Sequence, residues 1–168
     1  LDKLYELFKS NLSDNITGAF ELNKKHIHEW VKNTDCVLIG QDAINIHNNT
    51  KHNSNKVRII CDTFDVYKSF RVMIKKNTNY NTYYKIVPVR VPYLPRLRKM
   101  SVYLSVNKQS LCVLDIYDTA SYNVIPYTVK HNTKIGTPRV LIMYTIIDYW
   151  MFRISRKKYS DIKNILNA

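Results

Sequence analysis

The sequence predicts a mixed α/β (α+β) fold in which helices cover a mixed sheet. Short apolar runs rich in β-branched residues, typical of buried strands, occur between segments whose apolar residues recur at helical spacing. Helices come first, then strand, strand, helix, several strands and again helices, an order that fits a sheet with helices packed on it. With 168 residues, 45% of them hydrophobic, the chain can form one domain with a substantial core.

The first part of the chain predicts two helices, two strands and a connecting helix. Leu4, Leu7 and Phe8 recur at helical spacing, and Phe20, Ile27 and Trp30 mark one side of a second helix. The expected elements are helices over 2–12 and 20–33, a strand over 36–39 ended by Gly40, a helix opening at 43–47, a polar loop over 47–55 and a strand over 56–61.

The remainder predicts a helix, an edge strand, a hairpin and a buried helix. The expected elements are a helix over 65–76, a strand over 83–91 placed at a sheet edge or a bulge by Pro88, a hairpin of 100–106 with 110–117, a helix over 137–152 and a short helix over 159–166. Thr137-Pro138 is a typical helix start. The 137–152 helix is apolar nearly all round, so it should be buried, with Asp148 as a structural polar group that contacts Tyr144 or a basic side chain.

One acid, Asp115, stands at the centre of the apolar run that begins at Leu111. A carboxylate inside a buried strand is costly unless it is paired, hydrogen-bonded or bound to a metal. Two interpretations remain open: a strand-end carboxylate that accepts backbone hydrogen bonds, or a metal ligand at the end of a sheet.

The net charge is +13, with 26 Lys and Arg against 13 acids, which predicts a polyanionic partner, most often nucleic acid. A generally basic surface is the alternative. The candidate phosphate contacts lie in loops or at helix ends: Lys75, Lys76, Arg96, Arg98, Lys99, Arg156, Lys157 and Lys158. Each cluster could instead be a solvated charged rim.

The three cysteines are far apart and lie in apolar runs, which disfavours a disulfide framework or a zinc knuckle and favours a reducing compartment. No apolar run reaches the roughly 18 residues of a membrane span, so no membrane partner is expected. Because the first residue is Leu, we expect a segment of a larger protein. It would be a single domain, with a helical lead-in over 1–34, a sheet with a crossover helix over 35–136, and C-terminal helices over 137–168.

Several short motifs follow one another in an order that resembles a known family. They are Leu38-Ile-Gly-Gln-Asp-Ala43, Ile59-Ile-Cys-Asp-Thr-Phe-Asp-Val-Tyr67, Val91-Pro-Tyr-Leu94, the stretch from Leu114 to Pro126, and Ile135-Gly-Thr-Pro138. Together they make most of the chain, from Cys36 to Arg153, resemble the nucleotidyltransferase domain of the poly(A) polymerases of poxviruses and other large DNA viruses.

The resemblance implies a polymerase β-like nucleotidyltransferase fold that adds adenylates from ATP to RNA 3′ ends. In such domains, carboxylates on adjacent strands hold two magnesium (or manganese) ions that bridge the ATP phosphates. Carried over by position, Asp65 and Asp115 would be catalytic metal ligands. Gly40 and Gln41 would face the nucleotide, because a glycine turn lets backbone amides approach phosphates.

Two departures from the family pattern leave the activity open. The family turn is commonly Gly followed by Ser, and here Gln41 follows Gly40. The acidic pair is normally spaced i, i+2 on one strand face, but Thr63 stands two before Asp65, and Asp62 would need a bulge to join the site.

The alternative is therefore a catalytically degenerate domain that binds RNA or supports assembly of a polymerase or virion complex. Other domains of the same chain, or a homo- or hetero-oligomeric partner, would then complete it. A weaker third possibility is a basic virion structural protein. The viral resemblance implies the host cytoplasm or the virion as the location.

Overall fold

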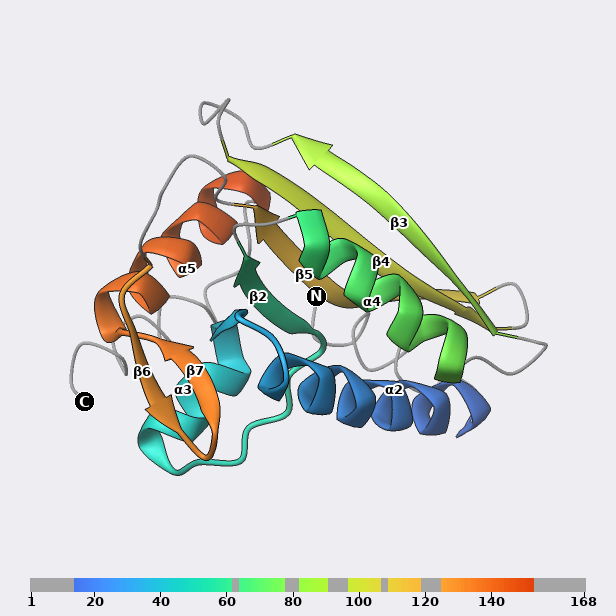
Figure 1. Cartoon of the computed structure of the whole chain (residues 1–168), viewed down its shortest axis with the longest axis horizontal. Coiled ribbons are helices and arrows are strands. Elements are labelled where there is room, and N and C mark those ends of the chain that lie inside the picture. Colours follow the sequence, from blue (N-terminus) through green and yellow to red (C-terminus); the bar gives the residue numbers. More distant parts are fainter. Residues whose placement is uncertain are drawn as a thin grey trace, which may run out of the picture.

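A computed structural model describes residues 14–61, 64–77, 82–90, 97–106, 109–118 and 125–152. Within these ranges a seven-stranded mixed sheet has the strand order β3-β4-β5-β2-β1-β7-β6 (Figure 1). The expected helices over 2–12 and 159–166 lie outside the described residues. In the part of the chain that is described, no helix is long and apolar enough to cross a membrane.

The strands divide into a long antiparallel half and a short mixed half. The bounds are β1 Val37–Ile39, β2 Val57–Cys61, β3 Thr82–Arg90, β4 Arg98–Val106, β5 Gln109–Asp118, β6 Tyr127–Lys130 and β7 Thr133–Gly136. Strands β3, β4 and β5 pair antiparallel, whereas β2 runs parallel to β5 and β1 parallel to β7. The short strand β1 thus lies between β2 and β7, inside the sheet.

The helices are α2 Asp14–Lys32, α3 Gly40–Asn48, α4 Phe64–Asn77 and α5 Pro138–Phe152. Helix α4 crosses in front of β4 and β5 in Figure 1, with α2 beneath it. The two helices meet through the edge-to-face rings of Trp30 and Phe70, whose centroids are 5.0 Å apart, and Trp30 Nε1 donates a hydrogen bond to Ser69 Oγ. Helix α5 packs against α3, β1 and β7.

Most elements begin or end near the residues that the sequence predicts. The edge position of β3 is confirmed, and Pro88 lies within it. The helix expected to open at 43–47 starts earlier, at Gly40, directly after β1. The β6–β7 hairpin was not expected from the sequence. Its turn has His131 and Asn132 in the left-handed region, φ 50° and 59°, and Asn tolerates that conformation better than most residues.

Candidate functional site

The most heavily charged part of the core surrounds Asp115, at the centre of β5. Its side chain is fully buried. The ammonium group of Lys56 pairs with Asp115 Oδ2, and Lys99 Nζ lies 3.1 Å from the same oxygen. Ser101 Oγ donates a hydrogen bond of 2.6 Å to Oδ1. Both carboxylate oxygens of Asp115 are therefore engaged by neighbouring side chains.

A second buried carboxylate, Asp148 on α5, joins the same group of charges. Arg58 Nη1 lies 3.1 Å from Asp148 Oδ2, and Lys99 Nζ lies 3.8 Å from Oδ1. The hydroxyl of Tyr117 donates a hydrogen bond to Asp148 Oδ1. We call Lys56, Arg58, Lys99, Asp115 and Asp148 the charge cluster. With all five groups ionised, its three positive and two negative charges give a net charge of +1.

The sheet register explains why these side chains meet. Successive residues of a strand face opposite sides. Arg58 lies on β2 and Lys56 directly precedes that strand, and both side chains reach Asp115. Arg58 is directly opposite Asp115 in the parallel β2–β5 pair, and Ser101 is opposite Asp115 in the antiparallel β4–β5 pair. Lys99, two residues before Ser101, lies on the same face of β4. Three adjacent strands thus present their polar positions toward one point.

The electrostatics follow from this arrangement. Burial alone raises the pKa of the Asp115 carboxyl, but the charges of Lys56 and Lys99 outweigh it, so the pKa lies below its ordinary value. Burial lowers the pKa of Lys99, and Asp115 and Asp148 oppose this without cancelling it. Burial and the neighbouring Asp148 raise the pKa of Tyr117 well above its ordinary value, so its hydroxyl remains a hydrogen-bond donor.

Gly40 forms the turn between β1 and α3, as the sequence predicts. Its φ of +72° belongs to the left-handed region, and a Cβ added there would lie 3.0 Å from Arg58 Cδ. The turn therefore packs directly on the charge cluster. The amide of Gln41 donates a hydrogen bond of 3.0 Å to Asn45 Oδ1, along the helix. The nucleotide contact expected of Gly40 and Gln41 stays a prediction.

Asp42, in the first turn of α3, is buried and well partnered. Ser54 Oγ donates to its Oδ1 at 2.6 Å, His28 Nε2 lies 3.3 Å from Oδ2, and Lys24 Nζ lies 3.5 Å from Oδ1. Burial raises the pKa of Asp42, yet the hydrogen bonds from His28 and Ser54 outweigh it and hold the pKa below its ordinary value. These contacts fix the turn that carries Gly40 against α2.

The expected acidic pair does not lie on β2. That strand ends at Cys61, Asp62 lies outside the described residues, and Asp65 lies in the first turn of α4, with only its backbone described. The resemblance placed Asp65 on a strand, and the helical spacing after it placed it on a helix; the helical placement is confirmed. Because β2 ends at Cys61 and α4 begins at Phe64, Asp65 belongs to the helix.

Among the residues that the structure describes, the side chains around Asp115 do not suit a divalent cation. A two-metal site needs several carboxylates that converge with free oxygens. Here the groups nearest the Asp115 carboxylate are ammonium groups, a guanidinium and a hydroxyl. Among the described residues, no group of three or more His, Cys, Asp and Glu side chains could hold a metal ion.

The basic residues expected to contact RNA lie in different settings. Lys75 on α4 and Arg98 at the start of β4 are exposed. Lys99 was expected beside them on the surface; instead it is 1% exposed, because the alternation of β4 turns it toward Asp115. Lys76 is described by its backbone alone, and Arg96, Arg156, Lys157 and Lys158 lie outside the described residues.

Sequence reasoning missed Lys56 and Arg58 as members of the site. The signal was present: two basic residues spaced i, i+2 on a buried strand, one strand away from a buried acid. Asp148 was expected to be a structural polar group that contacts Tyr144 or a basic side chain, and its pairing with Arg58 confirms the second alternative.

Comparisons with known proteins agree on the fold. No family model matches the chain. Uncharacterized proteins of African swine fever virus match in sequence. One from a tick isolate from Malawi is 27% identical over 153 residues, covering 85% of this chain and 36% of that protein. One from a South African tick isolate is 25% identical over 155 residues, with the same coverage. The chain thus spans about a third of these relatives.

The Megavirus polyadenylate synthase has a similar structure, with a TM-score of 0.65, 12% sequence identity, and coverage of 99% of this chain and 36% of that chain. A proposed nucleotidyltransferase from Helicobacter pylori aligns with a TM-score of 0.50 and 16% identity, over 74% of this chain and 57% of that chain. At these identities the likeness shows the fold. The chain has a nucleotidyltransferase-like fold, as its motifs predict, and it has sequence relatives in a large DNA virus.

Proposed function

We propose that this nucleotidyltransferase-like chain is a catalytically degenerate domain that binds RNA through fixed positive charges and does not itself transfer nucleotides. The observation that carries the proposal is the engagement of Asp115 by Lys56, Lys99 and Ser101. A carboxylate that already has these partners on both oxygens would have to exchange them for a metal ion before it could support phosphoryl transfer.

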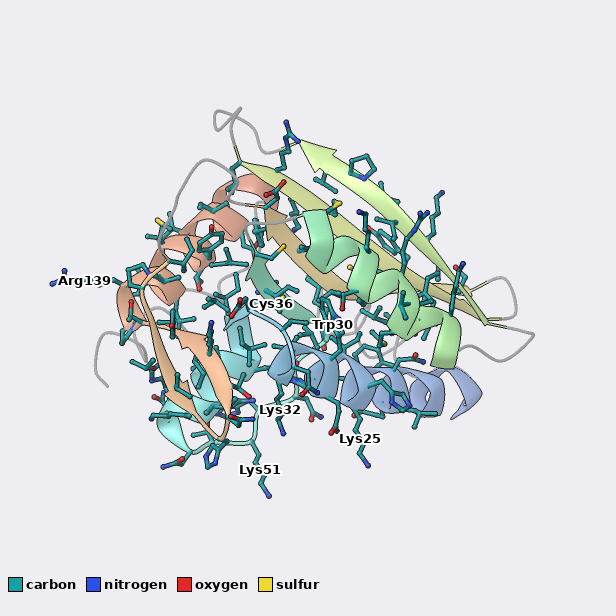
Figure 2. All side chains as sticks on the ribbon, in the orientation of Figure 1. Lys25, Trp30, Lys32, Cys36, Lys51 and Arg139 are labelled. Atoms are coloured by element: carbon teal, nitrogen blue, oxygen red, sulfur yellow. The ribbon has the colours of Figure 1, made fainter. Side chains whose placement is uncertain are left out.

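The positive charge that a binding role needs is present on the surface. Lys25 and Lys32 are seven residues apart on α2, and both are exposed, as is Lys51 in the loop after α3. Figure 2 shows these three lysines projecting from the same side of the molecule, whereas Arg139 projects elsewhere. We call Lys25, Lys32 and Lys51 the lysine surface. With the net charge of +13, it favours a phosphate backbone as the ligand.

A direct test is RNA binding by the full-length protein in EDTA, across a series of salt concentrations. The proposal expects binding without divalent cations, weakened steeply by salt. Lys25→Glu with Lys32→Glu should weaken binding and reduce the salt slope by about one unit for each phosphate that the variant no longer neutralises. The matched control is Lys85→Glu with Arg139→Glu, which changes the net charge equally at exposed positions away from the lysine surface. Equal weakening by both pairs would contradict a localised surface.

Adenylate addition to RNA 3′ ends is the second candidate, because the structurally similar Megavirus protein is a polyadenylate synthase. It would require ATP, Mg²⁺ or Mn²⁺, and carboxylates that reach Asp115. The test is extension of a labelled RNA by the full-length protein, with Asp115→Asn beside it. Extension that the substitution abolishes would overturn the degenerate assignment. Extension that persists in a folded variant would place the chemistry elsewhere in the protein, and RNA binding without extension supports the proposal.

A further inference from the structure

The charge cluster explains how the domain can fold without bound metal ions. This inference rests on the proposed function in one respect, since in both the charge cluster around Asp115 is non-catalytic. Its basis is the position of Lys56 and Arg58 rather than the chemistry of RNA.

Lys56 and Arg58 lie where an acidic pair would have to be to share metals with Asp115. Arg58 lies on β2, the strand beside β5, and Lys56 stands two residues earlier, directly before that strand. Both side chains reach Asp115 Oδ2. Arg58 also packs over the Gly40 turn. Asp62 and Asp65, the acids that were expected in this role, come after the end of β2.

Basic side chains of the charge cluster compensate the negative charges of Asp115 and Asp148. A buried carboxylate needs a compensating positive charge, which a bound cation or a basic side chain can supply. Asp115 receives it from Lys56 and Lys99 at Oδ2, and Asp148 receives it from Arg58. The side chains of Lys56 and Arg58 are 25% and 16% exposed, so both are partly open to solvent while they contact the buried acids.

We infer that Lys56 and Arg58 replace an acidic, metal-binding pair, so that fixed side-chain cations neutralise Asp115 where a divalent cation would otherwise bind. The domain is then complete without metal. Returning carboxylates to these two positions should create a site for a divalent cation between β2 and β5, since three carboxylates would converge on the side of the Gly40 turn.

The experiment compares thermal unfolding and Mn²⁺ binding by electron paramagnetic resonance in three forms of the full-length protein. They are the unmodified protein, the variant Lys56→Asp with Arg58→Asp, and the matched control Lys56→Gln with Arg58→Gln. The control removes the same two cations without supplying ligands. We expect Mn²⁺ to raise the unfolding temperature of the aspartate variant alone, with saturable binding at a stoichiometry near one and reversal by EDTA.

Failure to gain Mn²⁺ binding in a folded aspartate variant would overturn the inference, and so would an equal gain in the glutamine control. If the double aspartate variant does not fold without metal, refolding it with and without Mn²⁺ gives the answer: rescue by Mn²⁺ supports the inference, and no rescue opposes it. The unmodified protein supplies an independent readout, because an unfolding temperature that EDTA lowers would contradict a metal-free centre. None of these readouts involves RNA, so the proposed RNA binding can fail separately.

Discussion

Arg58 on β2 and Asp148 on α5 form an ion pair, Nη1 to Oδ2 at 3.1 Å, that joins the middle of the sheet to helix α5. The same arginine lies over the Gly40 turn. One side chain therefore connects β2, α3 and α5, and its removal should affect all three elements.

A double-mutant cycle on this pair measures the connection. Asp148→Leu leaves Lys56, Arg58 and Lys99 with one carboxylate, so we expect it to lower the free energy of unfolding by about 3–5 kcal/mol, as when one partner of a buried pair is removed. Arg58→Met removes the other partner. Because each single change leaves a buried charge uncompensated, the double variant should be less destabilised than the sum of the two, by about 1–3 kcal/mol in urea denaturation. Strict additivity would show that the two residues are not coupled.

Gly40→Ala should destabilise the domain by about 1–2 kcal/mol, because a side chain at φ +72° is strained. The added Cβ would also meet Arg58 Cδ at 3.0 Å. Chemical denaturation measures the change. The matched control is Gly18→Ala in α2, where nothing lies within 4 Å of the added atom. There the better helix propensity of alanine should stabilise by up to about 1 kcal/mol. Equal effects at the two positions would contradict the structure of the turn.

The stability of the protein should fall in acid through Asp42 and Asp115. Both carboxyl groups have a folded-state pKa below the ordinary value, so the unfolded chain binds more protons. Their contribution is fully present above about pH 4, the unfolded pKa, and is lost as the pH falls through the lower folded pKa. Urea midpoints measured from pH 5 to pH 2.5 should fall less steeply in Asp42→Asn. Glu29→Gln, at an exposed position of α2, controls for the loss of one negative charge, and an unchanged slope in Asp42→Asn would contradict the prediction.

The thiol of Cys112 should react slowly although it is only partly buried. Burial, followed by the negative charge of Asp115, raises its pKa to about 11. Since the thiolate is the reactive form, its fraction at pH 8 is on the order of a hundredfold smaller than for an ordinary cysteine. Ellman's reagent should therefore label Cys112 far more slowly in the native protein than in guanidinium, with peptide mass spectrometry identifying the labelled site. Fast native labelling of Cys112 would contradict this environment.

Local sequence signals predicted much of the fold. The apolar runs around Val37, Ile59 and Leu114 did form strands, and Pro88 did mark an edge strand. These predictions succeeded because an apolar run and a proline without an amide hydrogen can be recognised within one segment, whatever strand it pairs with. The β6–β7 hairpin escaped prediction since its strands are short and β6 is largely exposed, which leaves little apolar alternation to detect.

The site was harder to predict because it depends on register. The sequence identified Asp115 and Asp148 as buried acids, but their basic partners come from β4, from β2 and from the residue directly before β2. Only the pairing of β2 with β5 places Arg58 opposite Asp115, and only the alternation of β4 turns Lys99 inward. A basic residue inside a charged run was therefore assigned to the surface, although it lies in the core.

The parallel pairing of Leu38 with Ile135 has a consequence for biosynthesis. Strand β1 is translated before the other strands of the sheet, and one of its two neighbours, β7, is translated only after all of them. Until then one edge of β1 lacks its partner, and contacts between residues so distant in sequence form slowly. Nascent chains should thus need protection from aggregation until β7 has been made. A truncation before Thr133 should leave one edge of β1 unpaired and the protein prone to aggregate.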